Sequence, residues 1–271
     1  MSPAPYGRVA GPVDQRSLKR AQGVSVPVSS TFPAFNASSP SDMLFWLDAS
    51  DATTITESGG AVLAWRDKSP NGINFSQAIA ANRPTTNTQT LNGKNVIVFD
   101  GSNDRLEGTN TTVVRSILAV VYINSSAQFK TIVGAKTSAA GSVDAFYFQS
   151  SGNVTGAPAT SVGEAGGNSL RAGTTTVTVP GHYILAGTVD DISTTRRLTM
   201  AINLRPENFA TSLANFRPYH GDMAIGAGYF NRNVVDFFNG RIAEIVAYSR
   251  KLEPQEIQTV RQYLNSKWRV Y

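Results

Sequence analysis

The chain has 271 residues, of which 41% are hydrophobic and 16% are charged, and it contains no cysteine. This composition is typical of a globular protein with its own core, and it excludes both a disulfide framework and thiol chemistry. The formal net charge of +5 is modest. No segment combines a stripe of Lys and Arg with interleaved aromatic residues, so nucleic-acid binding is not expected.

Residues 1–41 predict an extended N-terminal arm rather than part of a domain. Six prolines interrupt this segment, with Gly, Ser and Ala between them. Such a composition buries too little apolar surface to offset the entropy cost of ordering the chain. We therefore expect the arm to be held by a neighbouring subunit. The side chains expected to anchor it on that partner are Arg8, Arg16, Lys19, Arg20, Val24 and Val26.

Targeting signals are not evident in the sequence. No segment approaches the roughly 18 consecutive apolar residues of a membrane span. The first eight residues are polar and contain two prolines, unlike the apolar centre of a signal peptide. We expect synthesis in the cytoplasm and no membrane partner. The alternative is an extracellular protein whose signal peptide has been removed.

The remaining residues, 42–271, predict one β-rich domain. Short runs that are apolar or that alternate between apolar and polar residues predict its strands. In chain order these runs are Met43–Leu47, Val62–Arg66, Asn95–Phe99, Ile117–Ile123, Lys130–Ala135, Ala145–Gln149, Tyr183–Val189, Arg197–Leu204, Met223–Gly228 and Arg241–Tyr248. Residues 150–180 predict a long loop or an irregular hairpin, 205–221 a connection, and Tyr229–Asp236 a loop.

A single helix is predicted to close the chain. Its apolar residues recur at spacings of three and four, which places them on one face; they are Ile257, Val260, Tyr263, Leu264 and Trp268. Pro254 suits the first helical position, and Glu253 with Glu256 is typical of a capping box. We expect this helix to pack across the strands. Trp46, Trp65 and Trp268 fall within element patterns, and we expect them in the core.

Several segments of the domain resemble one known family. The segments from the end of the domain are Phe238–Ile245 and Tyr248–Leu252, followed by Glu256-Ile257 and Tyr263-Leu264. Those from its beginning are Phe45–Asp51, Val62–Ser69 and Val98–Asp104. Together they resemble a concanavalin A-like, laminin G-like jelly-roll domain, of the kind found in phage virion surface proteins. The resemblance implies an all-β sandwich over residues 42–271, and this fold serves many unrelated functions.

The resemblance also raises the question of catalysis, because the family includes glycoside hydrolases. Those enzymes carry Glu-x-Asp-x-x-Glu on one strand, and this chain contains no Glu-x-Asp. Glu244 is the only acid within Arg241–Tyr248, so we expect it to be a paired structural residue. The two histidines, His182 and His220, accompany no nucleophile motif. The sequence therefore predicts a protein that is not an enzyme.

A calcium site is the one metal site that the resemblance suggests, because laminin G-like and lectin relatives bind Ca²⁺ through oxygen ligands at the loop rim. Asp190 and Asp191 follow the predicted strand Tyr183–Val189 and could supply carboxylates. Asn231, Asn233 and Asp236 could join them if the two loops are neighbours. The alternative, two turn acids in water, is favoured. No other cofactor is expected.

A glycan site would combine an exposed aromatic platform with amide and carboxylate hydrogen bonds. The best local cluster consists of Tyr229, Phe230, Asn231 and Arg232, with Tyr219 and His220 nearby in sequence. Tyr and Arg are also enriched in protein interfaces, so the same cluster could bind a protein partner.

Two functional hypotheses follow. The first is a structural protein of a bacteriophage virion, either a capsid decoration protein or a tail or fibre adhesion protein. Residues 1–41 would anchor it on other virion subunits, and it would form a homo-oligomer. The second is a secreted, lectin-like module that binds carbohydrate.

Overall fold

The computed structural model describes residues 42–136, 146–151, 154–164, 169–216, 221–231 and 233–271. The predicted arm, residues 1–41, lies outside the described residues, so its anchoring role stays a prediction. Within the described residues, no helix is both long enough and apolar enough to cross a membrane.

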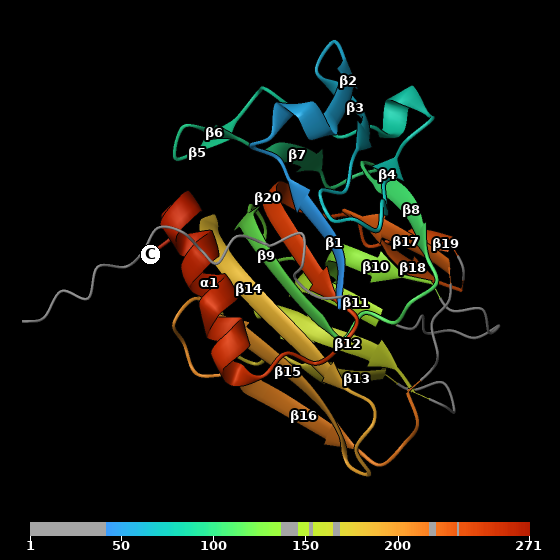
Figure 1. The fold of residues 1–271 in the computed structure, drawn as a ribbon, viewed down its shortest axis with the longest axis vertical. Helices are drawn as coiled ribbons and strands as arrows, with labels where there is room; N and C mark the ends of the chain where they lie inside the picture. The colour runs from blue at the N-terminus through green and yellow to red at the C-terminus, as the bar shows by residue number, and fades with distance from the viewer. Residues whose placement is uncertain (1–41, 137–145, 152–153, 165–168, 217–220, 232) are drawn as a thin grey trace, which may run out of the picture. The chain divides into compact units, whose positions relative to one another are not determined.

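The described residues form two antiparallel β-sheets and one C-terminal helix (Figure 1). The first sheet has seven strands. Its order is β1 (Met43–Asp48), β20 (Asn239–Tyr248), β9 (Ser116–Ile123), β14 (Gly181–Asp190), β15 (Arg196–Ile202) and β16 (Asn208–Ser212), with β7 (Ile97–Asp100) also paired with β20. The prediction of an all-β sandwich with a C-terminal helix is confirmed.

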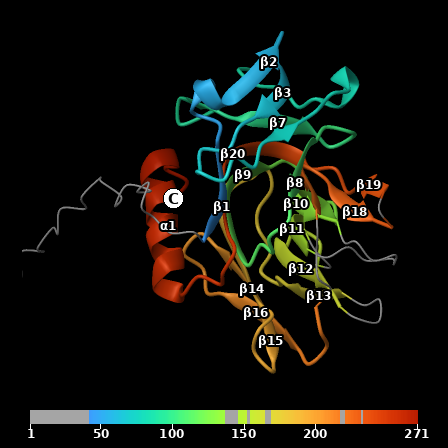
Figure 2. The same ribbon diagram turned by 45° about the vertical axis from the view of Figure 1, so that its right-hand side comes forward.

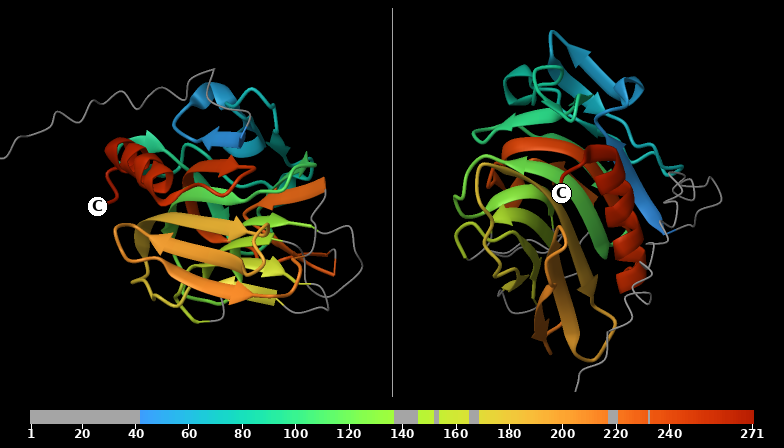
Figure 3. Two further views of the ribbon diagram at one scale, coloured as in Figure 1. Left: turned by 60° about the horizontal axis from the view of Figure 1, so that its bottom comes forward. Right: turned by 90° about the vertical axis from the view of Figure 1, so that its left-hand side faces the viewer.

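The second sheet has nine strands. Its order is β13 (Ser169–Ala172), β12 (Ala159–Gly163), β11 (Phe146–Ser151), β10 (Lys130–Ala135), β17 (Gly221–Ile225), β8 (Leu106–Asn110), β4 (Phe75–Ser76), β3 (Ala61–Trp65) and β2 (Ile55–Ser58). In the left panel of Figure 3, strands β14–β16 lie in front of the strands of this sheet. Two hairpins complete the β structure: β5 (Thr90–Leu91) with β6 (Lys94–Asn95), and β18 (Gly228–Phe230) with β19 (Asn233–Val235). The described residues also contain two short 3-10 helices, Ala52–Thr54 and Ala80–Asn82.

The core lies between the two sheets because alternate side chains of each strand point inward. Leu185 and Ile117 of the first sheet share one buried cluster with Phe148 and Met223 of the second. Strand β9 is buried along almost its whole length, which matches the prediction of a central strand covered on both faces.

The outer face of the first sheet is covered by α1 (Pro254–Trp268), which contacts β9 and β14. The helix starts as the sequence predicts, with Pro254 in its first turn and a reciprocal capping box between Glu253 and Glu256. Its buried residues are Ile257, Val260, Leu264 and Trp268. Figure 2 shows α1 and the β18–β19 hairpin on opposite sides of the sandwich.

Glu244 joins the helix to the sheet. This fully buried carboxylate accepts hydrogen bonds from the Trp46 and Trp268 indoles, both at 2.6 Å. It also accepts one from the Tyr263 hydroxyl at 2.9 Å and pairs with the Lys267 ammonium at 2.8 Å. Burial raises the pKa of Glu244, and the Lys267 charge opposes that rise. Glu244 is thus paired, as the sequence predicts.

Three details of the predicted fold are wrong. Trp65 and Trp268 are fully buried, but Trp46 is only half-buried, because its indole lies at the edge of the helix–sheet contact beside Lys68. The predicted connection 205–221 contains β16, whereas the antiparallel pairing of β12 with β13 within residues 150–180 agrees with the predicted irregular hairpin. The predicted loop Tyr229–Asp236 is mostly the hairpin β18–β19. These strands are short and rich in small or polar residues, so their sequence pattern is weak.

Candidate functional site

The β18–β19 hairpin lies on the outer face of the second sheet, over β10. Gly134 makes this approach possible: a Cβ at this position would lie 2.5 Å from the carbonyl oxygen of Ala227 and 2.8 Å from the Cα of Gly228. A small apolar cluster under the hairpin contains Ala224, Ala227 and Tyr229, with Val234 and Phe237 packed against it. The hairpin therefore has its own contact surface on the sheet.

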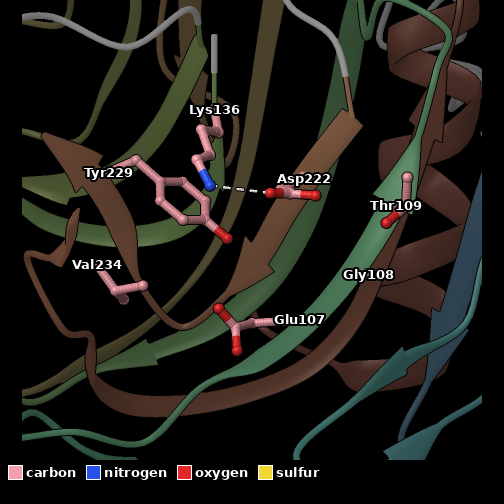
Figure 4. A pocket seen from close by; sticks show the side chains of 7 residues that line it. All are labelled: Glu107, Gly108, Thr109, Lys136, Asp222, Tyr229 and Val234. Carbon is pink, nitrogen blue, oxygen red and sulfur yellow. Dashed lines mark hydrogen bonds and ion pairs between the residues drawn. The ribbon is translucent and has the colours of Figure 1, made fainter. Parts of the chain in front are cut away.

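A pocket of about 330 Å³ opens beside this hairpin (Figure 4). Strands β8 and β17 form its floor, because residues two apart on each strand face outward together. The register places Glu107 opposite Ala224 and Thr109 opposite Asp222. The residues that line the pocket are Glu107, Gly108, Thr109, Lys136, Asp222, Tyr229 and Val234.

Each charged side chain that lines the pocket forms an ion pair. The Lys136 ammonium lies 3.0 Å from a carboxylate oxygen of Asp222 and 5.6 Å from the centroid of the Tyr229 ring. The backbone N–H of Lys136 also donates to the carbonyl of Asp222, at 2.8 Å. Glu107 pairs with Arg105 at 3.5 Å, and Arg105 lies outside the lining. The pocket thus presents carboxylates, hydroxyls and one ammonium beside an aromatic wall.

The structure separates the residues of the predicted aromatic cluster. Tyr229 forms part of the pocket wall but is only 2% exposed, so the prediction of an exposed platform at this residue is wrong. Packing of the hairpin on the sheet buries the ring. Phe230 is 48% exposed, and strand alternation turns it away from Tyr229. Asn231 is exposed at the turn with a φ of 48°. Three further predicted residues, Tyr219, His220 and Arg232, lie outside the described residues.

Most of the residues that line the pocket are not predicted from the sequence. Glu107, Thr109 and Asp222 come from two strands that are more than 110 residues apart in the chain. Each is an ordinary polar residue in an alternating run, and only strand pairing brings them together. Lys136 directly follows the predicted strand Lys130–Ala135, and its sequence context does not indicate a ligand site either.

The predicted calcium ligands do not come together. Asp191 pairs with Arg115 at 2.6 Å. Asp190 accepts hydrogen bonds from Ser193, which keep its pKa below the usual range although burial opposes this. Among the described residues, no group of three or more His, Asp or Glu side chains is placed to hold a metal ion.

The sheet register shows why Asp190 and Asp191 lie far from the segment Tyr229–Asp236. Thr188, two residues before Asp190, lies opposite Ser116. Gly240, four residues after Asp236, lies opposite Ile123. Ser116 and Ile123 are the two ends of β9. The condition under which Asn231, Asn233 and Asp236 would join the aspartates is therefore not met, because a strand of this length separates the two ends by about 25 Å.

Two acids and a histidine outside the lining of this pocket have shifted pKa values. Burial raises the pKa of Asp104 and of Asp236 to about 6 in each case. His182 packs against Tyr122, with ring centroids 4.5 Å apart and ring planes inclined by 55°. Burial and the charge of Arg241 lower the pKa of His182. This packing is consistent with a structural role for His182.

No family model matches this chain, and no curated protein matches its sequence. Solved structures share its fold at low identity. The protein HCR/D-Sa-GBL1/C has a TM-score of 0.56 at 10% identity over 82% of this chain and 52% of its own. The botulinum neurotoxin serotype C1 binding domain has a TM-score of 0.53 at 9% identity over the same shares.

A third similar structure is an arabinofuranosidase complexed with arabinofuranosyl-α-1,2-xylobiose. It has a TM-score of 0.50 at 16% identity over 83% of this chain and 59% of its own. The chain thus spans between half and three fifths of the length of these three structures. At these identities the likeness shows the β-sandwich fold alone.

Proposed function

We propose that this protein is a non-catalytic module that binds glycans in the pocket beside the β18–β19 hairpin. The observation that carries the proposal is the pocket itself, about 330 Å³ in volume and lined by Glu107, Thr109, Lys136 and Asp222. Pockets of about 300–1,000 Å³ with a few convergent polar groups are typical ligand sites. Saccharides offer many hydroxyls, which both donate and accept hydrogen bonds.

The position of the pocket supports this proposal. Helix α1 covers the outer face of the first sheet, whereas the pocket opens on the outer face of the second. Glu107 and Asp222 can accept from sugar hydroxyls, and Thr109 can donate or accept. A saccharide complex among the proteins of similar fold is compatible with this use of the sandwich.

The ion pairs favour binding over hydrolysis. Glycoside hydrolysis uses two carboxyl groups, one of which must deliver a proton to the leaving oxygen. Both carboxylates of the pocket have a cationic partner, Asp222 at 3.0 Å and Glu107 at 3.5 Å. Each carboxylate of the pocket thus faces a cation, and we assign both to recognition as hydrogen-bond acceptors.

A glycan array probed with the labelled full chain tests the proposal. We expect binding to a defined subset of glycans, and calorimetry should show binding at least about tenfold weaker for Glu107→Gln or Thr109→Val. A hydrogen bond to a charged group contributes about 1.5–3 kcal/mol, and 1.4 kcal/mol corresponds to tenfold in affinity. The control Glu207→Gln changes an exposed acid outside the lining and should bind as wild type. An array without any bound glycan would refute the proposal.

The virion hypothesis rests on the arm, residues 1–41, which lies outside the described residues. The solved structures of similar fold give it no support. Anchoring on virion subunits and homo-oligomerisation therefore stay predictions. Limited proteolysis would test them, since an arm buried in an assembly should resist cleavage near Arg8–Arg20 only in that assembly.

A further inference from the structure

We infer that the pocket selects neutral, hydroxyl-rich saccharides and discriminates against acidic ones, such as those that end in a sialic or uronic acid. The inference rests on the proposed function, because it names the ligand class of the same site.

Two cations of the described residues, Lys136 and Arg105, pair with carboxylates of the pocket. Lys136 is the one cation among the described lining residues, and its ammonium pairs with Asp222 and faces the Tyr229 ring. Arg105, the partner of Glu107 at 3.5 Å, does not line the pocket. An acidic sugar would therefore find no uncommitted positive charge on the described lining and would have to compete with Asp222 for Lys136.

The carboxylates, by contrast, keep acceptor capacity. An ionised carboxylate has about four acceptor sites on its two oxygens, and each ion pair engages only part of them. Figure 4 shows Lys136 on one side of Asp222 and Thr109 beyond its other side. Glu107 lies below the Tyr229 ring in the same view. Hydroxyls that enter the pocket can thus donate to two carboxylates and exchange a hydrogen bond with Thr109.

An acidic sugar meets the same two carboxylates as like charges. Like-charge juxtaposition across a binding site suppresses the wrong partner, and the repulsion is strongest where solvent is displaced. A neutral sugar has no such penalty. Charge complementarity therefore favours the neutral member of any matched pair of glycans.

The test compares a neutral oligosaccharide from the array with the same oligosaccharide in which sialic acid replaces the neutral terminal sugar. Calorimetry on the full chain should show at least about tenfold tighter binding of the neutral glycan. The double variant Glu107→Gln and Asp222→Asn keeps the side-chain shapes and removes both negative charges. We expect it to lower the neutral-to-acidic affinity ratio at least about fivefold.

A matched double variant, Glu57→Gln with Glu207→Gln, removes two exposed negative charges outside the lining and should leave the ratio unchanged. Thermal unfolding of all three proteins checks that each is folded. Equal or tighter binding of the acidic glycan, or an unchanged ratio in the pocket variant, would overturn the inference while leaving glycan binding intact. Failure to bind either glycan would overturn the proposed function and this inference with it.

Discussion

Glu244 illustrates, at the scale of single residues, how one buried group can determine the packing of a whole element. Four side chains donate to its carboxylate, three of them from α1. Lys267 also pairs with Asp48 at 2.7 Å, so one ammonium lies between two buried carboxylates. The network gives the buried charges partners, which is the condition under which charge is tolerated in a core.

We predict that Glu244→Ala strongly destabilises the protein, by about 3–5 kcal/mol, because removing one partner leaves buried charge and donors uncompensated. Chemical denaturation measures the free energy of unfolding. Glu207→Ala, at an exposed acid whose ion pair with Arg197 measures 3.9 Å, should change it by less than about 0.5 kcal/mol. A cost for Glu244→Ala no larger than that of the control would show that the network does not hold the helix.

The raised pKa of Asp104 predicts that the free energy of unfolding depends on pH. Its pKa is raised by burial from an ordinary 3.8 to about 6. A raised folded-state pKa means that the group stabilises the fold fully below about pH 4 and that this contribution is lost as the pH rises through about 6. The melting temperature of wild type should therefore fall relative to that of Asp104→Asn between pH 4 and 6.

The asparagine keeps an acceptor for the backbone N–H of Asp100, which donates to Asp104 at 2.9 Å. Differential scanning calorimetry at several pH values measures both proteins. A melting-temperature difference that stays constant from pH 4 to 7 would show that Asp104 does not titrate in this range.

At the scale of elements, Gly134 determines where the β18–β19 hairpin lies. We predict that Gly134→Ala displaces the hairpin from β10, because the new Cβ would meet backbone atoms of Ala227 and Gly228 within 3 Å. Glycan affinity should fall at least about tenfold while the sandwich stays folded. Calorimetric binding and circular dichroism measure the two effects.

Gly72→Ala is the control for this prediction. Open space surrounds a Cβ at this position, but its φ is +68°, so the cost is limited to about 1–2 kcal/mol of backbone strain. Stability should fall slightly and glycan affinity should not change. If Gly134→Ala bound glycans as well as wild type, the hairpin would not shape the site.

The sequence predicts elements better than it predicts the site, and particular elements show why. Strand β9 is a continuous apolar run, which indicates a central strand, and helix α1 has apolar residues at spacings of three and four, which indicate a helix and its buried face. Strand β16 has five residues with little hydrophobic contrast, so the sequence alone does not distinguish it from a loop. The pocket depends on the pairing of β17 with β8 and on a hairpin folded over β10. Local periodicity carries no information on such long-range pairing.

At the scale of the domain formed by the described residues, the two outer faces of the sandwich differ. One is covered by α1 and joined to it by the Glu244 network. The other holds the hairpin and the polar pocket (Figure 2). The proposed function thus assigns a structural role to one face and recognition to the other.

Backbone NMR of the ¹⁵N-labelled full chain, titrated with a neutral glycan that the array identifies, tests this division of the two faces. We expect chemical-shift changes that cluster at Glu107–Thr109, Asp222–Ala224 and Tyr229–Val234. Changes that cluster instead along α1 or around Asp190–Asp191, or no changes at saturating glycan, would contradict it.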